Sequence, residues 1–105
     1  MTNVNHHQVP LQHIIDDAEK AIQVAEDAEM AVRHAQLESN PEKLASSIQK
    51  LETAQRAVQQ AQSELNSHLN DSNRQELLQV QEQLTQASQS MDIVSGNTHQ
   101  PKQIR

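Results

Sequence analysis

Apolar residues recur along most of this chain at steps of three and four positions, and this spacing restricts the chain to α-helices. A helix turns by about 100° per residue, so residues at such steps line up along one face. The pattern covers residues 10–38, 41–69 and 73–95. Its apolar positions are Ile14, Ala18, Ala21, Ala25, Ala28, Val32 and Ala35 in the first stretch, Leu44, Ile48, Leu51, Ala54, Val58, Ala61, Leu65 and Leu69 in the second, and Leu77, Val80, Leu84, Ala87, Met91 and Val94 in the third. We therefore predict three amphipathic helices.

A polar cluster, Ser39-Asn40-Pro41-Glu42, separates the first two helices. Asn40 can cap the second helix with Pro41 in its first turn, where the missing N–H costs nothing. Alternatively, Ser39 and Glu42 can form a capping box. Both interpretations start the second helix near residue 41.

A second polar cluster, residues 70–73, separates the second helix from the third. A capping box is possible either between Ser72 and Gln75 or between Asn73 and Glu76. Because this cluster contains neither proline nor glycine, a single merged helix is also possible at this junction.

Three long helices joined by short turns must fold back on one another. The sequence therefore predicts an all-α fold, an antiparallel three-helix bundle that forms one domain over residues 10–95. Gly96 is expected to end the third helix, because glycine adopts the left-handed conformation that often follows a helix. Residues 1–9 and 96–105 are then flexible tails. The alternative is a hairpin of the first two helices on which the third helix packs in trans, within a homodimer.

The core of such a bundle is thin, because the chain contains 11 Ala and no aromatic residue. A buried aromatic side chain removes roughly 150–250 Å² from water, whereas an alanine contributes little. The chain also has no cysteine, so neither disulfides nor thiolate ligands supplement the core. We therefore expect either modest stability or a contribution from self-association.

The formal net charge is −6, and residues 10–38 carry most of it, with seven acids and two bases. An acidic surface repels phosphate groups, so neither nucleic acid nor a membrane surface is expected as a partner. No apolar run approaches the roughly 20 residues of a membrane span, and the first residues do not form an export signal. We accordingly expect a cytoplasmic protein.

No residue pattern of an enzyme or a cofactor site stands out. There is no glycine-rich loop to hold phosphate. His13 and Asp17 are one helical turn apart, but even with His6 and His7 they would bind a metal only weakly, because a structural zinc site needs four fixed ligands. His34 lacks the basic neighbours of a phosphate-accepting histidine. We expect no catalytic activity, no cofactor and no metal.

Polar residues within the apolar faces are the first candidate interaction site. Gln55 and Gln62 lie seven residues apart in the second helix, and Gln81 and Ser88 are equally spaced in the third. Polar side chains in a helix seam need partners and can set register or oligomeric state. These residues either join the second and third helices, or line an interface between two copies, or lie hydrated at the rim of the bundle.

Two further candidate groups lie off the apolar faces. One consists of apolar residues that project outward, namely Met30, Leu78 and Ile93. Singly exposed apolar residues are common, but a group of them can form a docking patch. The other is the acidic face of the first helix, formed by Asp16, Glu19, Glu26 and Asp27.

The helices are rich in Gln and Glu and use an Ala-x-x-Ala spacing, as at Ala18 and Ala21. In this spacing and in size, residues 10–95 resemble the short all-helical proteins of unknown function from Bacillus-type spore-forming bacteria. The resemblance implies a helical fold and no particular activity. We expect a non-enzymatic helical interaction or structural module that self-associates. The alternative is a small acidic regulator that docks its first helix onto a larger partner protein.

Overall fold

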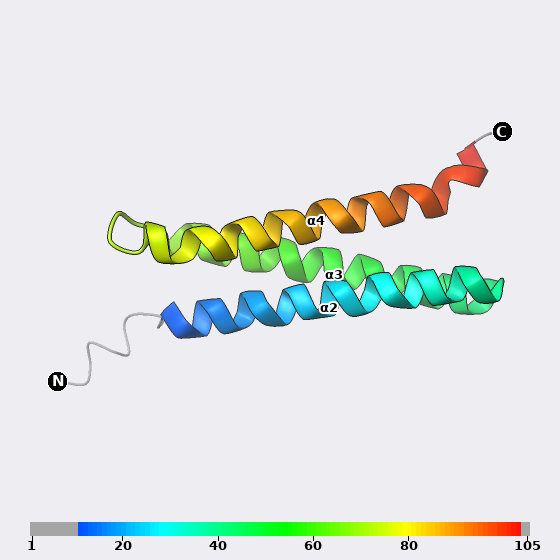
Figure 1. Cartoon of the computed structure of the whole chain (residues 1–105), viewed down its shortest axis with the longest axis horizontal. Coiled ribbons are helices and arrows are strands. Elements are labelled where there is room, and N and C mark those ends of the chain that lie inside the picture. Colours follow the sequence, from blue (N-terminus) through cyan, green and yellow to red (C-terminus); the bar gives the residue numbers. More distant parts are fainter. Residues whose placement is uncertain (1–10, 104–105) are drawn as a thin grey trace.

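A computed structural model of the chain describes residues 11–103, with side chains described for residues 11–96. It contains three long helices, α2 (Leu11–Glu38), α3 (Pro41–His68) and α4 (Arg74–Gln103), and no strand within the described range. The helices alternate in direction, and each contacts the other two in a rod with extents of 60 × 22 × 18 Å (Figure 1). The all-α three-helix bundle predicted from the sequence is thus confirmed.

The apolar faces of the three helices meet in one core. All seven predicted positions of α2 are buried, and so are all those of α4 except the partly buried Ala87. Leu77, Leu84 and Met91 of α4 are each 0% exposed. The third helix therefore completes the core in cis, and the arrangement in trans is not what the structure shows.

The buried face of α3 differs from the predicted one near the start of the helix. Ser47 is buried, whereas Leu44 and Ile48 are only partly buried. Ser47 lies four positions before Leu51, and Leu44 lies three positions before Ser47. Ser47 therefore occupies a core position of the heptad pattern that Ile48 was predicted to fill. The Ser47 hydroxyl donates to the carbonyl oxygen of Leu44 at 2.9 Å, which satisfies this polar group inside the core.

The end of α2 is a tight reversal centred on Ser39. This residue has a φ of 54°, in the left-handed region. Its N–H donates to the carbonyl oxygen of Gln36 at 3.2 Å, and the N–H of Asn40 donates to that of Ala35 at 3.4 Å. The two bonds form a Schellman motif, which satisfies carbonyl groups that the end of the helix leaves free.

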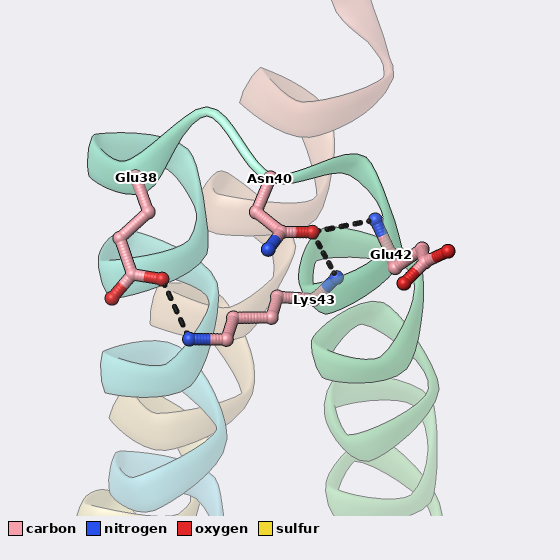
Figure 2. Close-up of polar contacts among 4 residues, drawn as sticks. All are labelled: Glu38, Asn40, Glu42 and Lys43. Atoms are coloured by element: carbon pink, nitrogen blue, oxygen red, sulfur yellow. Dashed lines mark hydrogen bonds and ion pairs between the residues drawn. The ribbon is translucent and has the colours of Figure 1, made fainter.

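The start of α3 is capped by Asn40, as one of the two sequence interpretations predicts. Its Oδ1 accepts hydrogen bonds from the backbone N–H groups of Glu42 at 3.0 Å and Lys43 at 3.1 Å (Figure 2). Pro41 occupies the first turn of the helix. The alternative, a capping box between Ser39 and Glu42, is not formed because Ser39 belongs to the end of α2.

The turn between α3 and α4 is held by Asn70 and Asn73. The backbone N–H of Asn70 donates to Oδ1 of Asn73 at 2.8 Å, and the backbone N–H of Asn73 donates to Oδ1 of Asn70 at 3.0 Å. The amide of the buried Asn73 also donates to the carbonyl oxygen of His68 at 2.9 Å. Its side chain thus folds back over the turn, so the predicted capping box with Glu76 is wrong. The merged helix is also ruled out, because the chain reverses here.

The sequence predicts that the third helix ends at Gly96, but α4 continues to Gln103. Gly96 has no positive φ and therefore remains in the helical conformation. A glycine inside a helix costs only about 0.5–1 kcal/mol relative to alanine, which is too little to end the helix by itself. Residues 96–103 are therefore helical, and Figure 1 shows this part of α4 diverging from α2 and α3. The predicted tail at residues 1–9 and the last two residues lie outside the described range.

Candidate interaction surface

The side of α2 that points away from the core carries a second regular row of residues. All eight are exposed and follow one another at alternating steps of four and three. We call this row the outer face of α2, and it consists of Gln12, Asp16, Glu19, Gln23, Glu26, Met30, Arg33 and Leu37. At about 100° per residue, it lies on the opposite side of the helix from the buried positions. Asp27, which is also exposed, flanks the row.

The hydrogen bonds made by the carboxylates on and beside this face come from uncharged amide groups. Asp16 accepts a hydrogen bond from the side-chain amide of Gln12 at 3.0 Å, and Asp27 accepts one from Gln23 at 3.2 Å. The ion pairs formed among the described residues join His13 to Asp17, Arg33 to Glu29 and Lys43 to Glu38. None of the four predicted acids, Asp16, Glu19, Glu26 and Asp27, takes part in these pairs. The predicted acidic face is thus exposed, and its four acids form no ion pair among the described residues, although Lys20 lies one turn from Asp16.

Two large apolar side chains continue the same face toward its C-terminal end. Met30 is 51% exposed and Leu37 is 82% exposed, and they are seven positions apart. Met30 was predicted to project outward, and Leu37 was not. Its position one heptad after Met30 would have predicted the same exposure. The outer face of α2 is therefore acidic in its first half, and in its second half it exposes Met30 and Leu37 with Arg33 between them.

The other predicted apolar residues do not join Met30 in one patch. Leu78 and Ile93 are exposed at 47% and 65%, but both lie on α4. Fifteen residues separate them, which corresponds to about 22 Å along a helix. Each is therefore a singly exposed apolar residue of the common kind.

The predicted seam glutamines lie at the rim of the bundle and still connect helices. Gln55 donates to Asp92 at 3.4 Å, and Gln81 donates to Asn66 at 3.1 Å, so both bonds join α3 to α4. All three glutamines, including Gln62, are partly buried. Gln55 and Gln81 thus bridge α3 and α4, as one of the expected alternatives has it, while all three side chains stay partly exposed at the rim. They do not pair with one another in a ladder.

One buried acid was missed by the sequence analysis. Glu29 is 8% exposed, and it lies beside Ile22, Gln86 and Ser90 in a groove of about 580 Å³ between α2 and α4. Its carboxylate lies 4.0 Å from the guanidinium of Arg33. The spacing could have predicted the burial of Glu29. Ile15, Ile22 and Glu29 are seven apart and share the flank of α2 that α4 covers.

The histidines do not form a chemical site in the described part of the chain. His13 lies 3.5 Å from Asp17, and the side chains described for residues 11–96 form no group of three or more potential ligands that could hold a metal. His6 and His7 lie outside the described residues. His34 lines a groove of about 390 Å³ with Glu38, Lys43 and Lys50, and these side chains are all exposed.

Comparisons with protein-family models, with curated proteins and with solved structures find no match to this chain. The resemblance to short helical proteins of Bacillus-type bacteria therefore stays a prediction. Within residues 11–103, none of the helices combines the length and the apolarity that crossing a bilayer requires.

Proposed function

We propose that this chain is a non-enzymatic helical protein-interaction module that docks the outer face of α2 onto a basic partner protein. The observation that carries the proposal is the composition of this face. Four exposed carboxylates without cationic partners, Asp16, Glu19, Glu26 and Asp27, lie on the same helix as the exposed Met30 and Leu37. Unneutralised charge speeds and orients the association with a partner of opposite charge, and apolar side chains add affinity when they are buried.

The other two helices offer less to a basic partner. Between residues 41 and 69, three acids are balanced by three bases. In α4, the exposed apolar residues Leu78 and Ile93 are far apart. Glu82 and Asp92 are exposed near these two residues, but the outer face of α2 combines three exposed carboxylates with two large apolar side chains only seven positions apart.

Self-association is the second candidate. Leu37 and Ile93 are the two most exposed large apolar residues of the described chain, and contact with another copy would bury them. Because the three apolar faces already meet within one chain, the core supplies no reason for a second copy. Light scattering on a sizing column over a wide range of concentration tests this candidate, and a species of constant monomeric mass would contradict it.

The docking proposal is tested by reversing the acidic face with Asp16→Lys, Glu19→Lys, Glu26→Lys and Asp27→Lys. The matched control reverses four exposed acids elsewhere, Glu52, Asp71, Glu76 and Glu82, so that both variants have the same net charge. Each immobilised protein is incubated with an extract of cells that contain the chain, and the captured proteins are quantified. We expect basic proteins to be captured by the original chain and by the control but lost from the α2 variant. Equal capture by the two variants would show that the outer face of α2 is not the docking surface.

A further inference from the structure

We infer that the element bound by the outer face of α2 is a basic amphipathic α-helix that lies along α2 in heptad register. This inference rests on the proposed function and specifies the partner by its chemistry. The steps of four and three along the outer face average 3.5 residues, which is the repeat that allows two helices to follow one another. From Gln12 to Leu37 the face covers 25 positions, or about 38 Å of helix.

The spacing along the face favours a helix over an extended strand. Met30 and Leu37 are seven positions apart, which is about 10.5 Å along the axis. Side chains on one face of a strand recur at about 6.7 Å, so neither one nor two such steps match this distance. One heptad of a partner helix matches it directly. Glu19 and Glu26 have the same seven-residue separation, so one partner helix can meet both pairs.

The polarity of the face determines the composition of the partner helix. Its acidic half contains Asp16, Glu19 and Glu26, and Lys or Arg on the partner would neutralise them. Its second half contains Met30 and Leu37, which call for two apolar residues one heptad apart. Arg33 lies between them, so the partner carries no cation opposite this half. The partner helix is therefore basic at one end of its contact stripe and apolar at the other.

A second copy of this chain fits the face poorly in either orientation. A parallel pair of outer faces places carboxylates against carboxylates, which repel one another. A fully overlapping antiparallel pair places Asp16 of one copy opposite Arg33 of the other. It also sets Glu19 against Met30 and Gln12 against Leu37, so polar groups lose hydration against apolar side chains. The single cation of the face, Arg33, cannot compensate for three acids. The distribution of charge thus favours a partner of different composition.

The inference is tested with two fluorescein-labelled synthetic peptides of about 25 residues that have the same composition of Ala, Gln, Lys and Leu. In the heptad peptide, the lysines and two leucines spaced seven apart occupy one helix face that is complementary to α2. In the shuffled peptide, the two leucines lie on opposite sides of the helix. Fluorescence anisotropy during titration with the full chain measures affinity, and circular dichroism of the mixture measures induced helix. We expect the heptad peptide to bind about tenfold more tightly and to gain helix, because only this peptide can bury both leucines.

Variants of the chain identify the face that is used. The double change Met30→Gln and Leu37→Gln is expected to abolish the preference for the heptad peptide. The double change Leu78→Gln and Ile93→Gln, at exposed apolar residues of α4, should leave this preference intact. Equal affinity for the two peptides, without induced helix, would overturn the inference of a partner helix and leave the docking proposal standing. If the reversal of the four acids lowers the affinity of the chain for neither peptide, the docking proposal itself is wrong. Dimerisation of the chain that competes with the heptad peptide would instead identify a second copy as the occupant and overturn the inference.

Discussion

The Nζ atom of Lys43 lies 2.8 Å from Oε1 of Glu38, so an ion pair spans the turn between α2 and α3 (Figure 2). The two residues are brought together because the chain reverses within Ser39 and Asn40. The hydrogen bond from Lys43 and the charge of this residue hold the pKa of Glu38 below its ordinary value of 4.5. Both side chains are more than half exposed, so solvent screens the pair and its contribution to stability is small.

The ion pair predicts a pH-dependent difference between the chain and its Lys43→Met variant. Because the pKa of Glu38 is lower in the folded chain, its stabilising contribution is fully present above pH 4.5 and is lost as the pH falls through the folded pKa. The difference in unfolding free energy between the two proteins should therefore shrink toward zero in acid. Urea unfolding followed by circular dichroism at stepwise lower pH measures this difference, and NMR titration of the carboxyl group should show a higher pKa of Glu38 in the variant.

A variant with Lys20→Met serves as the control for this experiment. Lys20 is an exposed lysine of α2 that belongs to none of the ion pairs among the described residues. Its removal should leave the pKa of Glu38 unchanged. If Lys43→Met also leaves the titration of Glu38 unchanged, the two side chains do not interact in solution.

Replacing Ser39 by glycine is expected to stabilise the bundle. Ser39 has a φ of 54°, and this left-handed conformation costs a residue with a Cβ atom about 1–2 kcal/mol, whereas glycine adopts it freely. The greater flexibility of glycine in the unfolded chain offsets part of the gain, so we expect an increase of about 0.5–1 kcal/mol in the free energy of unfolding. Ser72→Gly is the matched control, because Ser72 lies in the other turn without a positive φ. Stabilisation by both changes, or by neither, would argue against strain at Ser39.

Removing the side chain of Asn73 should destabilise the turn between α3 and α4. In Asn73→Ala, the backbone N–H of Asn70 and the carbonyl oxygen of His68 lose their partners. Leaving partly buried polar groups unpaired costs about 1–3 kcal/mol, which thermal unfolding followed by circular dichroism can measure. Asn66→Ala removes an exposed bond to Gln81 and should cost less than about 0.5 kcal/mol. Similar losses in the two variants would contradict a special role for the buried Asn73.

Truncation of Leu84 tests whether α4 completes the core within one chain. Leu84 is 0% exposed, so Leu84→Ala should lower the free energy of unfolding by about 2–5 kcal/mol. Leu78→Ala, on the exposed side of the same helix, should stay within about 0.5 kcal/mol of the original chain. Urea unfolding at two protein concentrations distinguishes the arrangements, because packing in trans makes the midpoint depend on concentration. A midpoint that rises with concentration would contradict closure in cis.

The candidate surface was only partly predictable from the sequence. Exposure of Asp16, Glu19, Glu26, Asp27 and Met30 follows from their positions off the apolar stripe. Leu37 was missed although it lies one heptad after Met30, whereas the burial of Glu29 was missed because it depends on which flank of α2 another helix covers. The partners of the seam glutamines could not be predicted either. Gln55 bonds to Asp92 and Gln81 bonds to Asn66, and these pairings depend on the register of α3 against α4.

The sequence by itself determined the features that depend on neighbours along the chain. The three helices, the buried face of α2 and the start of the second helix near residue 41 follow from residues that lie within one or two turns of one another. Tertiary structure decided what depends on contacts between distant segments. It buried Ser47 in place of Ile48, folded the side chain of Asn73 back over its turn, covered Glu29 with α4 and placed the third helix in cis. The physical reason is that periodicity shows which face a helix will bury but carries no information about which surface will cover it.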